Sequence, residues 1–156
     1  MDFRIRKDAR AWFKGLDSVI GTSAKGFEYY YFCLCAGLMS GNKLSVAASE
    51  CDALIDHYPT EYKAKGRILV ACMISKELET LGIDVAERSR VHETIRTLVD
   101  PHALSNLSDY GMEQMNGYAA GGFEVLSEGI SEPPRVLPTF LIEYTQLLAE
   151  LEAEAI

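Results

Sequence analysis

The segment from Phe27 to Met39 constrains the fold of this chain more than any other stretch. It reads FEYYYFCLCAGLM, with Glu28 as its one charged residue, so it is too apolar to remain in water. It is also shorter than the roughly 20 apolar residues that a membrane-spanning helix needs. Periodicity alone does not separate a buried helix from a buried strand. The absence of β-branched residues and the many Leu, Met, Ala and Cys residues favour a helix, which other elements must cover.

Length and composition indicate a single globular domain. The chain has 156 residues with charge mixed throughout, which suits one domain with a real core. Glu132-Pro133-Pro134 is the one stiff linker, and no internal repeat or second domain is evident, so we expect residues 1–156 to form one domain. The net charge of -8 argues against a surface that binds nucleic acid or anionic lipid over its whole extent, because such binding needs Lys and Arg.

The sequence also bears on compartment and on metal binding. The N-terminus lacks the apolar run and cleavage site of a signal peptide, and no apolar run reaches membrane-spanning length. We therefore expect a cytoplasmic protein that does not enter a membrane, with reduced thiols and no disulfide. The four cysteines lie in apolar or helical contexts and are expected to be buried: Cys33, Cys35, Cys51 and Cys72. Cys33 and Cys35 point about 200° apart on a helix, so we expect no metal and no cofactor.

The remaining periodicity predicts an all-α bundle. Residues 3–6 alternate apolar and basic, which favours a short edge strand or extended arm. Apolar residues at three- and four-residue spacing predict further helices at 8–20, after Ser45, and at 61–81, 85–99, about 109–128 and 138–153. Gly21 would end the first of these, and Thr22-Ser23 would cap the central helix. We therefore expect a single-domain bundle of about six or seven helices with a short N-terminal extended arm.

The expected inner faces and caps of five of these helices can be named. Helix 61–81, expected to be the longest, should bury Tyr62, Ile68, Leu69, Ala71, Cys72, Leu78 and Leu81 and expose Lys63, Lys65, Glu77 and Glu79. The short helix after Ser45 should bury Val46, Cys51, Leu54 and Ile55, and helix 138–153 should bury Phe140, Leu141, Tyr144, Leu147, Leu148 and Leu151. Asp84 to Glu87 resembles a capping box that starts helix 85–99, and Ser108 should cap helix 109–128.

Glycines in helix 109–128 need an explanation, because each costs about 1 kcal/mol relative to Ala in a helix interior. They are Gly111, Gly117, Gly121 and Gly122. Close packing of another backbone is one explanation, and a kink at Gly121-Gly122 is the other.

Positive charge gathers at the N-terminus. Residues 1–25 contain six cations against three acids, and the cations are Arg4, Arg6, Lys7, Arg10, Lys14 and Lys25. If any part of the chain contacts phosphate, it is this segment, although the same charges also suit a solvated helix face.

Other surface features favour protein contacts. Tyr29, Tyr30 and Tyr31 cannot all face inward on one helix, and Tyr is enriched at interfaces, so we expect a subunit contact there or on the Leu-rich last helix. Six glutamates form the expected acidic surface: Glu77, Glu79, Glu143, Glu150, Glu152 and Glu154. No Ser-His-Asp, Cys-His or metal-ligand pattern is evident, so we expect no enzymatic activity.

One resemblance concerns the start of the chain. It opens with Arg4-Ile5-Arg6-Lys7-Asp8-Ala9 and continues with Leu16, Gly21 and the helical Phe32-Cys33-Leu34-Cys35. Over about 35 of 156 residues this resembles the start of DndE, the small helical protein of bacterial DNA phosphorothioation systems. The present chain is longer and acidic, and it has no lysine-rich face beyond its N-terminal quarter.

DndE proteins are cytoplasmic oligomers that bind nicked duplex DNA through lysines. The resemblance therefore implies a non-enzymatic accessory or assembly subunit of a DNA-modification or anti-phage defence system, contacting DNA through the basic N-terminal segment. The residues alone leave a second hypothesis open. In it, the chain is an acidic protein-interaction module, such as an adaptor, inhibitor or immunity-type protein, with a basic partner and no nucleic-acid binding.

Overall fold

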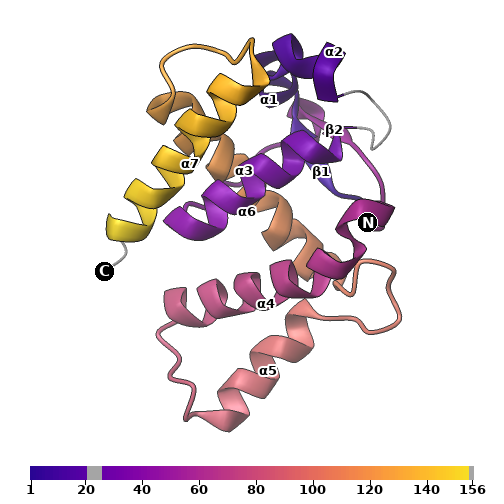
Figure 1. Ribbon diagram of the computed structural model, residues 1–156. Coiled ribbons are helices and arrows are strands. Elements are labelled where there is room, and N and C mark those ends of the chain that lie inside the picture. The colour runs from indigo at the N-terminus through magenta and orange to yellow at the C-terminus, as the bar shows by residue number, and fades with distance from the viewer. Residues whose placement is uncertain (21–25, 155–156) are drawn as a thin grey trace. The chain divides into compact units, whose positions relative to one another are not determined.

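The computed structural model describes residues 1–20 and 26–154 and is mostly helical (Figure 1). Within these ranges the helices are α1 (Lys7–Trp12), α2 (Asp17–Ile20), α3 (Phe27–Ser40), α4 (Lys63–Thr80), α5 (Arg88–Leu98), α6 (Asp109–Gly129) and α7 (Leu137–Glu154). Two short strands, β1 (Arg4–Arg6) and β2 (Cys51–Ala53), and 3-10 turns at Lys14–Leu16, Ala48–Glu50 and Thr60–Tyr62 complete the described elements. The predicted helical fold with an N-terminal extended segment is confirmed.

The chain forms two compact units. The α4–α5 unit comprises Met1–Phe3 and Ile55–Met115, and the α3–α7 unit comprises Arg4–Leu54 and Asn116–Ile156. The division falls within α6, whose first residues belong to one unit and whose remainder belongs to the other. That residues 1–156 form a single domain stays a prediction.

Helix α3 is the core of the α3–α7 unit, as its composition predicted. Its buried residues are Phe27, Tyr29, Tyr30, Cys33, Leu34, Ala36, Gly37 and Leu38. Gly41 follows with a φ of 73°, a left-handed conformation that favours glycine at a helix C-terminus. Its amide donates to the Gly37 carbonyl at 2.8 Å, which ends the helix.

Glycines of α6 lie directly against the backbone of α3. A methyl group on Gly122 would overlap the Cys33 carbonyl oxygen, and one on Gly37 would overlap the Tyr118 carbonyl oxygen. Gly121 has the same relation to the Asn42 carbonyl. The explanation of the α6 glycines by close packing of another backbone is therefore confirmed for the α3–α7 unit.

The segment after Ser45 differs from the prediction. In place of a helix, Ala48–Glu50 forms a 3-10 turn and Cys51–Ala53 forms β2. Strand β2 pairs antiparallel with β1, with Arg4 opposite Ala53 and Arg6 opposite Cys51. The physical reason is that an isolated short helix is marginal, whereas pairing satisfies the backbone groups of both strands.

The predicted continuous helix 8–20 is three pieces: α1, the Lys14–Leu16 turn and α2. The interruption surrounds Gly15, where a methyl group would overlap the Pro134 carbonyl oxygen. The predicted inner residues Phe13 and Leu16 are nevertheless buried. Gly21 and the predicted Thr22-Ser23 cap lie outside the described residues.

The buried face of α4 differs from the predicted one. Its buried residues are Gly66, Leu69, Val70, Met73 and Glu77. The predicted inner residues Ile68 and Leu81 are 63% and 57% exposed, and Cys72 is also exposed. The reason is the contact of the Tyr58 ring with Gly66, where a methyl group would lie 2.6 Å from ring carbons. That contact turns a different face of α4 inward. Helix α4 was also predicted to be the longest helix, but α6, with 21 residues, is longer.

Two predicted caps are present as hydrogen bonds. The Ser108 hydroxyl accepts from the Gly111 amide at 2.9 Å at the start of α6. Glu87 accepts from the Asp84 amide at 2.8 Å, as in a capping box, but these residues form a turn and the helix begins at Arg88. Helix α5 is therefore shorter than the predicted 85–99.

Candidate protein-binding groove

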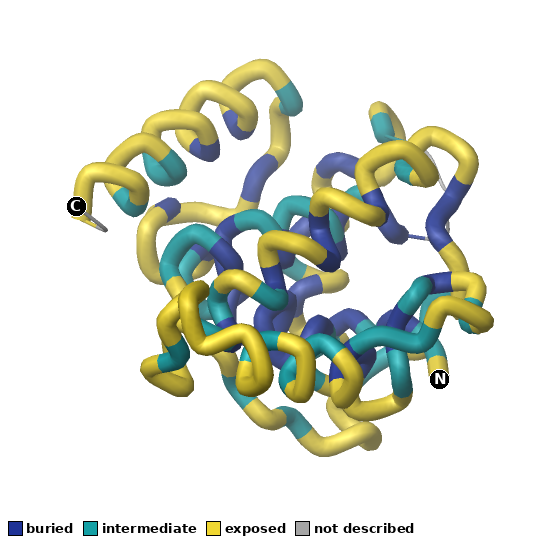
Figure 2. Tube along the Cα trace, turned by 90° about the horizontal axis from the view of Figure 1, so that it is seen from below, coloured by how far each residue is buried: buried dark blue, intermediate teal, exposed yellow. Residues whose placement is uncertain are grey.

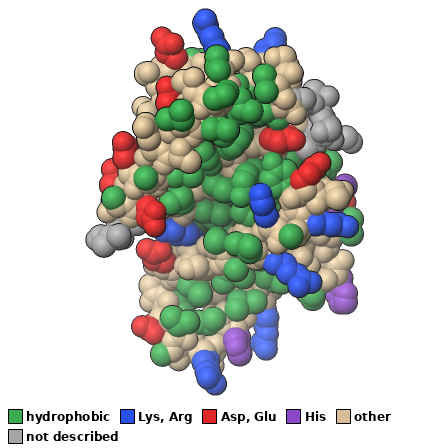
Figure 3. Space-filling view, in the orientation of Figure 1, with side chains coloured by type: hydrophobic (Ala, Val, Ile, Leu, Met, Phe, Trp, Pro, Cys, Tyr) green, Lys and Arg blue, Asp and Glu red, His purple; other side chains and the backbone are tan. Residues whose placement is uncertain are grey.

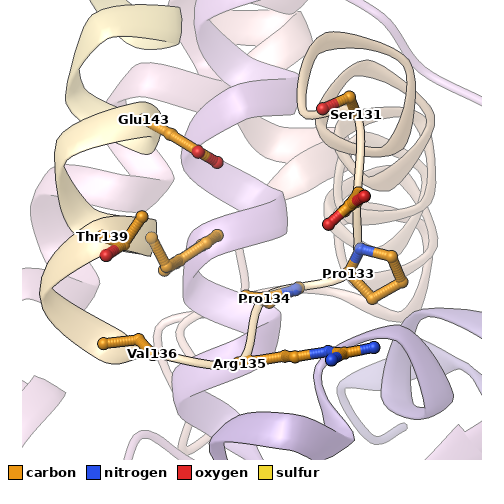
Figure 4. A pocket seen from close by; sticks show the side chains of 9 residues that line it. Ser131, Pro133, Pro134, Arg135, Val136, Thr139 and Glu143 are labelled. Carbon is orange, nitrogen blue, oxygen red and sulfur yellow. The ribbon is translucent and has the colours of Figure 1, made fainter.

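Two adjoining pockets lie between α7 and the segment that precedes it, within the α3–α7 unit. One, of about 190 Å³, is lined by residues 131–136 with Thr139, Phe140 and Glu143 (Figure 4). The other, of about 240 Å³, is lined by Gly129, Ile130, Ser131, Glu143, Gln146, Leu147 and Glu150. Ser131 and Glu143 line both, so we treat them as one surface, the α7 groove, with residues 129–136 and α7 as its walls.

The wall formed by residues 129–136 is fixed at two points. Pro134 is buried, and its carbonyl packs against Gly15. At the other end, a methyl group on Gly129 would lie 2.7 Å from the Leu147 side chain. The sequence predicts a stiff linker at Glu132-Pro133-Pro134 but not its role as a wall, because the contact of Pro134 with Gly15 is not visible in the sequence.

Helix α7 is held on the unit by aromatic residues. Phe140 is buried against Phe13, Phe32 and Tyr144, with ring centroids 5.1–5.6 Å away. The Tyr144 hydroxyl donates to the Phe32 carbonyl at 2.9 Å, and burial raises the pKa of this phenol. These contacts hold α7 in place as one wall of the groove, and none of them involves a glutamate.

The rest of α7 is mostly exposed, although the predicted stripe is partly present. Only Phe140 and Tyr144 are buried, while Leu147, Leu148 and Leu151 are half-buried. Leu141, predicted to face inward, is 40% exposed, and Ile142 is 60% exposed. The helix that ends at the C-terminus is accordingly mostly yellow in Figure 2.

The charge of the groove is acidic. Three carboxylates line it, Glu132, Glu143 and Glu150, with Arg135 as the single cation among its lining residues. In Figure 4, Glu143 points from α7 into the space facing Ser131, and Arg135 lies at the opposite end.

Helix α7 contributes most of this negative charge. It contains four glutamates and no Lys or Arg, and acidic side chains gather along it in the space-filling view (Figure 3). No ion pair found among residues 1–20 and 26–154 involves Glu143 or Glu150. This potential favours a cationic ligand.

The predicted acidic surface is divided between the two units. Glu143, Glu150, Glu152 and Glu154 are exposed on α7. Glu79 is exposed but pairs with Lys76 at 3.3 Å, and Glu77 is 5% exposed, so its predicted exposure was wrong. Glu77 faces inward because the buried face of α4 also includes Gly66, Val70 and Met73, which are spaced three or four residues apart.

Two arginines of the basic N-terminal segment are engaged within the protein. Arg6 pairs with Asp8 at 2.6 Å and Glu124 at 3.1 Å, and its side chain is 17% exposed. The hydrogen bond to Asp8, with that to Glu124, raises the pKa of Arg6 despite partial burial. Arg10 pairs with Asp52 at 3.3 Å but stays exposed.

The other cations of the segment differ in exposure. Arg4 is half-buried and its Nε atom has no hydrogen-bond partner among the described residues. Lys7 and Lys14 are exposed, and Lys25 lies outside the described residues. Among the described cations of this segment, the exposed ones are Lys7, Arg10 and Lys14.

The tyrosine triplet is mostly internal. The Tyr29 hydroxyl donates to Asp17 at 2.6 Å, and burial followed by this bond raises the pKa of Tyr29. The Tyr30 hydroxyl donates to the Asn116 side chain at 2.9 Å. Both rings are buried, and Tyr31 is half-exposed. The predicted subunit contact stays a prediction, with Tyr31 as its most accessible residue.

The cysteines vary in burial. Cys33 is buried and burial raises the pKa of its thiol, Cys35 and Cys51 are half-buried, and Cys72 is exposed, so the prediction that all four are buried was wrong. In the parts of the chain that the structure describes, no three His, Cys, Asp or Glu side chains are grouped as metal ligands. Among those same residues, every helix is too short or too polar to cross a bilayer.

Comparisons with protein-family models, with curated proteins and with solved structures found no match.

Proposed function

We propose that this protein is a non-enzymatic binding protein, an adaptor or accessory subunit, whose α7 groove holds a cationic segment of a partner protein. The observation that carries the proposal is the acidic groove beside exposed apolar residues. Glu132, Glu143 and Glu150 line a concave surface. Val136 also lines it and is exposed, and the exposed Ile142 lies one helical turn before the lining residue Gln146. A basic, partly apolar segment complements both features.

The two features contribute differently to binding. Exposed ion pairs are worth only about 0.2–1 kcal/mol each, so the glutamates mainly raise the association rate and select the sign of the partner. Burial of apolar area contributes about 25 cal/mol per Å². Val136 and Ile142 therefore supply affinity that the carboxylates alone do not.

The test uses a labelled amphipathic helical peptide of Lys and Leu, with the same peptide carrying Glu in place of Lys as its control. Fluorescence anisotropy at low salt measures its affinity for the wild type and for Glu143→Lys/Glu150→Lys. We expect the double variant to bind at least tenfold more weakly, because attraction becomes repulsion at two positions. The Glu peptide should not bind.

A matched variant separates the groove from net charge. Glu50→Lys/Glu61→Lys changes two exposed glutamates outside the groove and gives the same charge change. We expect it to retain peptide affinity within about twofold. Equal losses in both double variants would mean that the peptide responds only to overall charge, and the proposed groove would be wrong.

A second candidate function is DNA contact, as an accessory subunit of a DNA-modification or anti-phage defence system. The observation that favours it is the exposure of Lys7, Arg10 and Lys14, spaced three and four residues apart. Arg10 pairs with Asp52 while exposed, so a phosphate can compete for it.

Anisotropy with a nicked DNA duplex at two salt concentrations tests this candidate. If all three cations contact phosphates, replacing them with Ala should reduce the slope of log affinity against log salt by roughly 2.7, at about 0.9 per contact. An unchanged affinity and slope in the triple variant would eliminate it.

A further inference from the structure

We propose that the cationic segment held by the α7 groove is helix α5 of a second copy of this chain. This inference rests on the proposed function, because it names the partner of the same groove. The evidence for it is the charge pattern of α5 and α7, which lie in different units. The proposed contact is between two molecules.

Helix α5 is cationic and almost entirely unburied. Of its 11 residues only Leu98 is buried. It carries three arginines and one glutamate. Arg90 pairs with Glu87 at 3.2 Å, whereas Arg88 and Arg96 are exposed and appear in no ion pair among the residues the structure describes.

Arg88 and Arg96 lie on one face of α5. With His92 between them they follow i, i+4, i+8 spacing, which places side chains along one side of a helix. All three are exposed. The row therefore offers two permanent positive charges to a partner.

At the N-terminus of α5 and at the C-terminus of α7, the charged side chains have the same sign as the nearby end of the helix dipole, which is unfavourable. Arg88 and Arg90 lie in the first turn of α5, which has no acidic residue, although the positive end of the dipole is there. Glu150, Glu152 and Glu154 lie near the C-terminus of α7, which has no basic residue in its last turn, although the negative end is there. The two helix ends are thus complementary to each other.

The spacing of the charges permits one antiparallel arrangement. Arg88 and Arg96 are eight residues apart, or roughly 12 Å along the axis, and Glu143 and Glu150 are seven apart, or roughly 10.5 Å. With α5 antiparallel to α7, Arg96 lies beside Glu143 and Arg88 beside Glu150. Flexible side chains absorb the difference of about 1.5 Å.

A contact between two copies of α7 fits the charges less well. It would bring glutamates together in a helix that has no Lys or Arg. The α5–α7 contact joins two different surfaces, so each copy carries one of each. The contact can occur twice in a two-fold dimer or repeat in an open chain.

The test is a charge exchange between two variants. The first, Glu143→Arg/Glu150→Arg, makes the groove basic, and the second, Arg88→Glu/Arg96→Glu, makes α5 acidic. Sedimentation velocity at about 200 µM and low salt measures the mass of the wild type, of each variant and of their equimolar mixture. Circular dichroism confirms that each variant keeps its helix content.

We expect the wild type to exceed the monomer mass and each variant alone to be a monomer. The mixture should form a complex, because the basic groove of one variant faces the acidic α5 of the other. The milder variants Glu143→Gln/Glu150→Gln and Arg88→Gln/Arg96→Gln should weaken wild-type association at least fivefold, and they serve where a reversal impairs folding.

A wild type that stays monomeric, or a folded mixture that does not associate, would overturn the inference. The lysine and leucine peptide distinguishes this failure from failure of the proposed function. If the peptide still binds the groove while the wild type is monomeric, the groove binds a cationic segment but α5 is not that segment. If the peptide and α5 both fail to bind, both proposals are wrong.

Discussion

Replacing Gly122 with Ala tests the backbone contact between α3 and α6, because two physical effects predict opposite signs. In a helix interior Ala is more favourable than Gly by about 1 kcal/mol, so propensity alone predicts a stabilised protein. The structure predicts the reverse. The new methyl group would overlap the Cys33 carbonyl oxygen and would also lie 2.6 Å from the Gly37 nitrogen.

The magnitude follows from what must move. Both contacting atoms belong to the backbone of α3, so no side-chain rotation relieves the overlap and the helices must separate. Overpacking a core costs about 1–3 kcal/mol and occasionally more. Because Gly122→Ala forces two helices apart, we expect its overpacking cost to lie at or above the upper end of this range. After subtracting the propensity gain, we expect a net loss of about 2 kcal/mol.

Urea unfolding followed by tryptophan fluorescence measures this loss. Trp12 is the only tryptophan and packs edge-on against Phe123 at 5.9 Å, so it reports on the α3–α7 unit. Gly129→Ala is the control within α6, because its methyl group would meet the flexible side chain of Leu147. We expect a change below 1 kcal/mol there. A Gly122→Ala protein as stable as the wild type, or more stable, would refute the close backbone contact.

Two further substitutions test other parts of the structure. Tyr144→Phe removes the hydrogen bond to the Phe32 carbonyl and should lower the free energy of unfolding by about 1 kcal/mol; an unchanged urea midpoint would contradict that bond. For Glu87, hydrogen bonds from the Asp84 amide and then from Arg90 lower the pKa, so its stabilising contribution is present at neutral pH and disappears as pH falls through the lowered value. Glu87→Gln should therefore lose less stability than the wild type between about pH 5 and 3, as measured by urea unfolding at each pH; parallel losses would contradict this contribution.

Local sequence patterns predicted the features that local physics determines. The apolar segment 27–39 predicted α3 because its composition leaves few alternatives, and Ser108 predicted the start of α6 because a cap acts within one helical turn. The glycines of α6 predicted close backbone packing, although their partner in α3 had to come from the structure.

Features that depend on distant partners were missed. Strand β2 exists because it pairs with β1, which lies more than 40 residues earlier, and the segment itself has no strong strand signal. The buried face of α4 depends on Tyr58 against Gly66. The α7 groove depends on Gly15 against Pro134, so Glu143 and Glu150 were predicted as acidic surface, but Glu132 and the concave shape were not.

Two features of this chain disfavour the helices that contain them, and they are compensated in different ways. Natural sequences tend to agree locally with their fold, and departures concentrate where tertiary packing or function requires them. The glycines of α6 oppose helix formation, and contact with the α3 backbone compensates for them inside the chain. The arginines at the start of α5 and the glutamates at the end of α7 oppose their own helix dipoles. Arg88, Arg96, Glu143 and Glu150 take part in no ion pair among the residues that the structure describes, so these charges are available to the partner proposed above.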